Sequence, residues 1–239
     1  TCAAFAQLGS GQFAAESQRR TELRAELAQL LGCQGSDIAL TTNTSAGVVA
    51  VACSIQWKRG DRIVLFRGEF PTNVTPWQRA AQRHGLQIVW LDADTFRTDP
   101  SAGLQQLEDV VKDGARLVAI SAVQFQTGAA MPLKEIGAIC RRSTATELFV
   151  DAIQALGSMP FDVINVGASY VSAGGHKWLM GPEGTGLLYA DRDSVSRWQP
   201  ELASWLSHDD GLKFLFEGSG HLRYDRPIRQ GVQWLERGA

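Results

Sequence analysis

The chain alternates short apolar runs with longer segments in which apolar residues recur every three or four positions. The short runs are typical of buried strands, and the longer segments are typical of helices with one apolar face. We expect strands at residues 38–41, 62–66, 87–91, 117–122, 148–150, 170–172 and 186–189. We expect helices at residues 17–31, 45–56, 73–84, 101–112 and 133–143.

This alternation predicts an α/β fold of three layers, α/β/α, with a mainly parallel seven-stranded sheet covered by helices on both faces. The exception is the last strand. The turn-rich segment 181–186 before it is too short for a crossover helix, so this strand is predicted to run antiparallel to its predecessor.

The same pattern divides the chain into three segments. Residues 1–36 are predicted to form a helical segment that packs on the large domain, residues 37–193 its core, and residues 194–239 an irregular segment. The chain lacks an initiator Met and stops at WLERGA without a terminal element. We therefore expect a fragment, or the ordered part of a longer protein.

Composition narrows the function classes. The chain has 25 acidic and 23 basic residues. Binding to a nucleic acid or an anionic membrane needs a basic excess, so we expect neither as a partner. Its apolar runs are shorter than the roughly 20 residues of a membrane span. Cys2, Cys33, Cys53 and Cys140 are scattered without a CxxC pair. This spacing predicts free thiols and no metal cluster. Free thiols are typical of a reducing compartment, so we expect the protein in the cytoplasm.

Polar residues follow several predicted strands, where ligands of parallel sheets bind. Residues 41–47, TTNTSAG, place hydroxyls and free N–H groups at a helix start, which suits a phosphate. An ordinary helix cap is the alternative. Phe70 follows the second strand and could stack on a flat heterocycle, although most aromatic side chains belong to cores.

Two further segments add charged groups. Asp151 ends a buried strand, where a carboxylate needs a partner such as a protonated ring nitrogen, unless it caps the next turn. Gln154 could donate to an oxygen on the same ring. Lys177 lies among glycines and apolar residues, and a lysine withdrawn from water is a good amine nucleophile. The alternative is a surface lysine beside a glycine-rich turn.

Together these segments offer a phosphate-binding helix start, an aromatic ring for stacking, a carboxylate for a ring nitrogen, a donor for a ring oxygen and an amine for an aldehyde. Pyridoxal 5'-phosphate (PLP) has all five matching features, so the sequence predicts PLP as cofactor. A nucleotide-binding protein is disfavoured, because the chain has neither GxGxxG after a strand nor GxxxxGK[ST].

The segments TTNTSAG, EFPTNVTPW, VQFQTGAAMPL, DAIQALG and SAGGHKWLMGPEGTGLLY occur in this order between residues 41 and 189. In these segments the chain resembles the class V aminotransferase family of fold-type I PLP enzymes. That family includes cysteine desulfurases, selenocysteine lyases and isopenicillin N epimerase-like proteins. The resemblance implies the large domain of a PLP-dependent transferase, with the small C-terminal domain missing from this chain.

The resemblance also implies roles for individual residues. Lys177 would form the internal aldimine and shuttle the Cα proton, and His176 would lie beside the phosphate or the aldimine. Many members carry a serine at the position of Gly174, so Ser172 would have to replace it as a phosphate donor. The remaining implied cofactor ligands are Thr44 and Ser45 for the phosphate, Phe70 for stacking, Asp151 for the ring nitrogen, and Gln124 and Gln154 for the ring oxygen.

For activity, the resemblance implies an enzyme that acts at Cα or Cβ of an amino-acid substrate, of desulfurase, C–S lyase, epimerase or transaminase type. The tail 234–239 is similar to a segment that reaches the partner subunit's phosphate in the family, which implies a homodimer. Ala239 stands where the family has a threonine. The alternative is a truncated, non-catalytic PLP-fold protein that acts as a binding or assembly partner.

Overall fold

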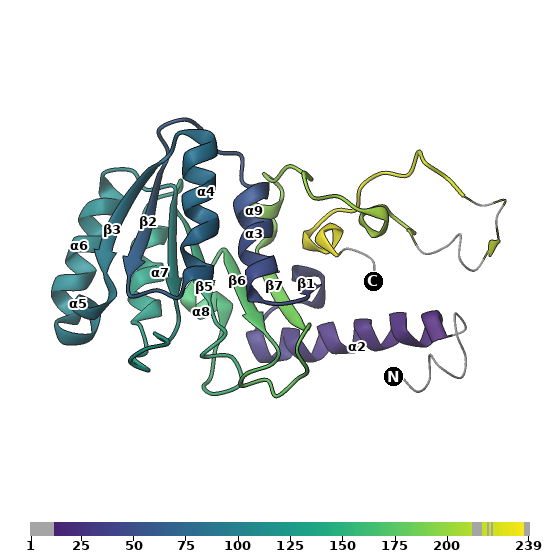
Figure 1. Ribbon diagram of the computed structural model, residues 1–239, viewed down its shortest axis with the longest axis horizontal. Helices are drawn as coiled ribbons and strands as arrows, with labels where there is room; N and C mark the ends of the chain where they lie inside the picture. Colours follow the sequence, from purple (N-terminus) through teal and green to yellow (C-terminus); the bar gives the residue numbers. More distant parts are fainter. Residues whose placement is uncertain (1–11, 212–216, 219, 221, 237–239) are drawn as a thin grey trace.

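The computed structural model describes residues 12–211, 217–218, 220 and 222–236. A seven-stranded sheet has the order β1-β7-β6-β5-β4-β2-β3 (Figure 1). The strands are β1 (Ile38–Thr41), β2 (Arg62–Arg67), β3 (Gln87–Asp92), β4 (Leu117–Ser121), β5 (Glu147–Asp151), β6 (Tyr170–Gly174) and β7 (Gly186–Ala190). β7 runs antiparallel to both neighbours, and the other pairs are parallel, which confirms the predicted topology.

Long helices form in the five segments that showed helical periodicity. They are α2 (Phe13–Leu31), α3 (Thr44–Ser54), α4 (Thr75–His84), α6 (Pro100–Lys112) and α7 (Leu133–Arg141). The helix predicted at 73–84 begins later, because a 3-10 turn, η3 (Pro71–Asn73), precedes it. Pro76 then occupies the first turn of α4, where its missing N–H costs no helical hydrogen bond.

Three short helices were not predicted: α5 (Ala93–Thr98), α8 (Val163–Val166) and α9 (Arg192–Val195). Each spans fewer than two turns, which is too short for an apolar period to show.

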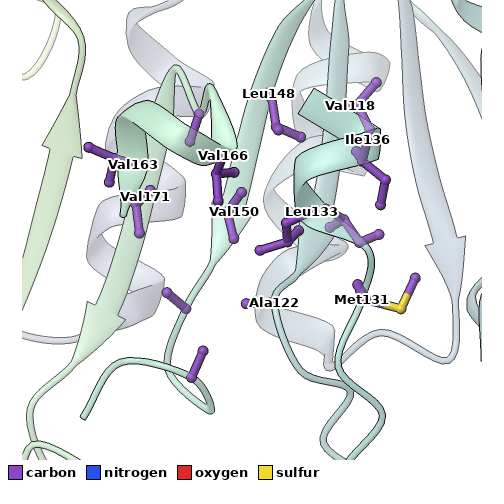
Figure 2. Close-up of a cluster of buried hydrophobic side chains, with 14 of the residues drawn as sticks. Val118, Ala122, Met131, Leu133, Ile136, Leu148, Val150, Val163, Val166 and Val171 are labelled. Atoms are coloured by element: carbon purple, nitrogen blue, oxygen red, sulfur yellow. The ribbon is translucent and has the colours of Figure 1, made fainter. Parts of the chain in front are cut away.

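Alternate residues of each central strand face opposite helical layers. Val118 of β4 packs in the cluster that includes α7 and α8, whereas Leu117 and Ala119 pack on the side of α3 and α4. Figure 2 shows the first cluster, in which Leu133 and Ile136 of α7 lie close to Val118, Leu148 and Val150 of the sheet. Full burial of one such aliphatic side chain stabilises the fold by about 2 kcal/mol. The predicted three layers are confirmed.

The C-terminal end of the described chain lies near β1, and so does the C-terminal end of α2, whereas α2 begins well away from the sheet (Figure 1). Glu236, which is buried, follows the turn η6 (Val232–Leu235). Its carboxylate accepts hydrogen bonds from Arg24 Nε of α2 and from the β1 amide of Leu40, both at 2.9 Å. The irregular C-terminal segment also contains the 3-10 turn η4 (Trp205–Ser207). Ala239 lies outside the described residues.

Among the described residues, no helix combines the length and the apolar character needed to cross a bilayer.

Candidate active site

A cavity of about 170 Å³ lies at the carboxyl ends of β4, β5 and β6. Five segments of the chain meet there, each at the end of a strand; four follow the strands where the sequence predicted polar residues, and the fifth is 121–125 at the end of β4. Seven of the nine candidate cofactor residues line the cavity: Thr44, Ser45, Phe70, Asp151, Gln154, His176 and Lys177. Its other lining residues are Asn43, Thr72, Ser121, Val123, Phe125 and Ile153.

A larger groove of about 720 Å³ lies between α3 and α4 and shares Ser45 and Thr72 with this cavity. The described residues that line the groove include neither a carboxylate nor a lysine. The smaller cavity is therefore the one equipped for the predicted chemistry.

The start of α3 forms one wall of the cavity. Asn43 caps the helix by accepting a hydrogen bond from the amide of Ala46 at 2.8 Å, and Ser45 Oγ lies 2.7 Å from Thr72 Oγ1. Thr44 Oγ1 is buried and has no hydrogen-bond partner among the described residues. A buried hydroxyl in this state costs about 1–3 kcal/mol. Together with free N–H groups and the positive end of the helix dipole, it makes the helix start suited to an anion.

Asp151, the last residue of β5, is only 3% exposed. Burial raises the pKa of its carboxyl from the ordinary 3.8 to about 7, and the charge of Glu69 contributes in the same direction. The amide of Ile153, which donates to Oδ1 at 3.0 Å, and the charge of Lys177 both oppose this rise in pKa. Asp151 thus caps the following turn, as in the alternative, and also faces the cavity. A cationic N–H bound there would stabilise its ionised form.

Gln154 contacts Trp178, which the sequence analysis did not assign a role. Trp178 Nε1 donates to Gln154 Oε1 at 3.3 Å. Because the indole nitrogen is a donor only, the amide oxygen must face it, and the Nε2 group of Gln154 remains a donor for another partner. This orientation suits the predicted contact with a ring oxygen.

Lys177 and His176 line the cavity from the turn that follows β6. Both side chains are exposed, so the expectation that the chain withdraws Lys177 from water is wrong. The turn forms its hydrogen bonds within itself, such as that from Gly181 N to Gly175 O at 2.8 Å, and so leaves both side chains on its outside. The turn packs closely at Gly174, where a Cβ would lie 2.9 Å from His176 Cε1.

Phe70 lies at the rim of the cavity and does not belong to the core, since 48% of it is exposed. Its ring meets that of Phe125 edge to face, with centroids 5.2 Å apart and an interplanar angle of 83°. An aromatic face at this rim is available to a planar ligand.

Gln124 and Ser172 are not among the described residues that line the cavity. Gln124 is buried and donates from Nε2 to Glu69 Oε1 at 2.8 Å. Ser172 Oγ donates to the main-chain oxygens of Thr44 at 3.0 Å and Leu187 at 3.2 Å. In this arrangement Ser172 does not replace the serine that the family carries at position 174.

Sequence reasoning also missed Glu69, a buried carboxylate that connects the loops after β2 and β4. The available signal was an acidic residue three positions after the apolar strand predicted at 62–66. Such residues are usually solvated, so the signal is weak.

Comparison with known proteins gives a consistent family. The model described as aminotransferase class-V matches residues 6–204. A probable cysteine desulfurase of Pyrococcus abyssi is 32% identical over 188 residues, which are 78% of this chain and 46% of that protein. An isopenicillin N epimerase of Streptomyces clavuligerus is 29% identical over 184 residues, with coverage of 77% and 46%. The chain thus spans about half the length of these curated relatives.

A solved structure of a cystine C–S lyase, in complex with its reaction product cysteine persulfide, superposes with a TM-score of 0.81 at 26% identity. The match covers 98% of this chain and 59% of the lyase. A variant of that lyase holds glycine covalently linked to its PLP cofactor. The fold of this chain is that of PLP-dependent transferases.

Proposed function

We propose that this chain, which belongs to the class V aminotransferase family of PLP-dependent enzymes, holds PLP at Lys177 and acts at Cα or Cβ of an amino-acid substrate. The observation that carries the proposal is one cavity lined by a buried carboxylate, an amine and the start of a helix. These groups come from three separate elements and match three different parts of the same cofactor.

The residues fit PLP on grounds of chemistry. Thr44 Oγ1 is a buried hydroxyl that lacks a protein partner, at a helix start that favours anions. Asp151 is a buried carboxylate whose charge would be stabilised by a cationic ring N–H. We propose that Thr44 and Ser45 bind the phosphate, Asp151 the ring nitrogen and Gln154 the ring oxygen.

We assign three further contacts around the ring. Lys177 Nζ is the amine that would hold the cofactor aldehyde; once the substrate amine has displaced it, the free amine would be able to take the proton from the substrate Cα. Phe70 would stack on one ring face, and His176 would lie beside the phosphate or the aldehyde. When bound, the cofactor supplies an electron sink for charge that develops at Cα. Gln124 and Ser172 support these residues from behind the cavity wall, through Glu69 and the main chain of Thr44.

Among reactions of this class, we favour cleavage of a C–S bond over transamination. The support is analogy with the probable cysteine desulfurase and the cystine C–S lyase.

We further propose a cytoplasmic homodimer in which the partner covers the mouth of the cavity. Large apolar side chains are exposed in the single chain at the rim of the cavity, Phe70 and Phe125, and on the turn that carries Lys177, Trp178 and Met180. Such a patch is typical of an interface. Cys33, Cys53 and Cys140 are free thiols, which suits a reducing compartment.

The proposal is tested by adding PLP to the purified protein and recording the visible spectrum. The protein should turn yellow, and the band should shift when cysteine or cystine is added. Lys177→Ala should lose the band, whereas Lys134→Ala, at an exposed position on α7, should keep it. A protein that takes up no PLP contradicts the proposal. A bound cofactor that no amino acid perturbs would favour a non-catalytic binding or assembly role.

A further inference from the structure

Glu69 is a carboxylate surrounded by donors. Oε1 accepts hydrogen bonds from the amide of Ser121 at 2.7 Å and from Gln124 Nε2 at 2.8 Å. Oε2 accepts from Ser121 Oγ and from Asn73 Nδ2, the latter at 3.2 Å. A carboxylate offers about four lone-pair sites, and these four donors occupy them. The ionised carboxylate is the form that accepts all four.

The network around Glu69 is also directional. Trp77 Nε1, which is buried and can only donate, contacts Asn73 Oδ1 at 3.1 Å. This contact fixes the amide of Asn73 with its NH₂ group toward Glu69. An amide in place of the carboxylate would set two NH₂ groups against each other or would turn its own NH₂ toward the Ser121 amide. Either arrangement leaves a buried donor without an acceptor.

The position of Glu69 links two walls of the cavity. Residues 70–72, which follow it directly, contribute Phe70 and Thr72 to the lining. Ser121 begins the segment 121–125, which contributes Ser121, Val123 and Phe125. Neighbouring β2 and β4 diverge beyond their paired residues, and the Glu69 hydrogen bonds join the segments that extend past them.

Glu69 also acts on Asp151 through its charge. Ser121 lies opposite Asp151 in the β4–β5 pairing, so the two carboxylates stand on either side of one strand end. Lys177 and His176 are the basic groups that line the same cavity. A fixed negative charge beside Asp151 favours a ligand that brings a positive charge to it.

We propose that Glu69 is a positioning residue for the cofactor: its ionised carboxylate joins the Phe70 wall to the Ser121–Phe125 wall and keeps the cavity selective for a cationic ring. Glu69 does not line the cavity itself, so it acts through Ser121, Gln124 and Asn73. This inference rests on the proposed function for the identity of the ligand. Its structural half, the joining of the two walls, does not depend on the ligand.

The experiment compares Glu69→Gln with the double variant Glu69→Gln/Asn73→Asp and with Glu135→Gln, an exposed site on α7. The double variant exchanges carboxylate and amide. The new Asp can accept from Trp77 Nε1 and from the new Gln, so the negative charge and the pairing of donors with acceptors are both kept. Two quantities are measured: amide hydrogen exchange of residues 119–125 in the cofactor-free protein, and the Kd for PLP.

We expect Glu69→Gln to speed exchange of the Ser121 amide and to weaken PLP binding by about tenfold, the typical effect of one charge-assisted hydrogen bond. The double variant should return both quantities to within about threefold of the unchanged protein, and Glu135→Gln should alter neither. If Glu69→Gln does not fold, Gln124→Met removes one donor without a change of charge and should shift both quantities in the same direction.

Unchanged exchange and an unchanged Kd in Glu69→Gln would overturn the inference. So would weaker PLP binding with unchanged exchange and without rescue by the double variant, because Glu69 would then touch the cofactor directly. If the unchanged protein binds no PLP, the proposed function fails on its own. Exchange of residues 119–125 then still decides whether Glu69 joins the two walls.

Discussion

Replacing Asp151 by Asn should stabilise the cofactor-free chain at alkaline pH and weaken its binding of PLP. Burial raises the pKa of Asp151 from 3.8 to about 7. One unit of pKa is about 1.4 kcal/mol, so the buried charge destabilises the folded chain by about 4 kcal/mol when fully ionised.

The direction of the pKa shift decides how the stability of the folded chain changes with pH. The folded chain holds the Asp151 proton more tightly than the unfolded chain does, so the destabilisation is absent below about pH 4. It grows as the pH rises and is complete above about pH 7. An amide at this position stays neutral throughout and can still accept from the amide of Ile153. Its NH₂ group lacks an assured partner, which lowers the free energy of unfolding of the variant by about 1 kcal/mol at every pH.

The assay is urea unfolding of the cofactor-free protein at several values between about pH 4 and about pH 8. The free energy of unfolding of Asp151→Asn should rise relative to the unchanged protein across this window, by about 4 kcal/mol in total. Asp92→Asn is the matched control, because Asp92 is an exposed cap of α5 that accepts from the amide of Asp94 at 3.0 Å. Asparagine caps helices equally well.

The same variant should bind PLP at least about tenfold more weakly, since it loses a charge-assisted hydrogen bond to the ring. Parallel stability curves for Asp151→Asn and the unchanged protein would refute the reasoning, because they would mean that the buried carboxylate is already compensated within the chain.

Three further predictions concern the cavity and the turn that carries Lys177. Thr44→Val should stabilise the cofactor-free chain by about 1 kcal/mol in urea unfolding and yet weaken PLP binding, because the buried hydroxyl lacks a protein partner; equal or tighter PLP binding would contradict the role of Thr44. Gly157→Ala should lower the free energy of unfolding by about 1–3 kcal/mol more than Gly60→Ala. Both glycines have positive φ, but a Cβ at Gly157 would lie 2.6 Å from the carbonyl oxygen of Trp178, whereas Gly60 faces open space. Equal losses in the two variants would show that the turn carrying Trp178 adapts freely. Trp178→Phe should raise the Kd for PLP about threefold by releasing the amide of Gln154; an unchanged Kd would mean that this amide is held by other contacts.

The sheet was predictable because each strand is short, apolar and separated from the next by a helix or a tight turn. The antiparallel β7 followed from the length of the 181–186 turn alone. The helices α5, α8 and α9 were not predictable, since their packing and caps decide them, and periodicity over four to six residues does not. The predicted division of the chain into the segments 1–36, 37–193 and 194–239 stays a prediction.

The site was predictable as a set of strand ends and less so as a set of side-chain directions. Ser172 lies in β6 between Val171 and Ala173, which pack in the cluster that includes α7 and α8, so its own side chain turns toward α3 and the carbonyl of Thr44. Gln124 turns inward because Glu69 offers an acceptor there. Glu69 itself becomes recognisable only when four donor groups, from Asn73, Ser121 and Gln124, meet around it.

The most direct test of the proposed function is the residue to which PLP becomes covalently attached. The protein would be loaded with PLP, reduced with borohydride, digested and mapped by mass spectrometry. We predict that the modified peptide contains Lys177, and that Asp151→Asn lowers its yield at limiting PLP. Modification spread over surface lysines, with Lys177 unmodified, would contradict the central claim that this cavity holds the cofactor.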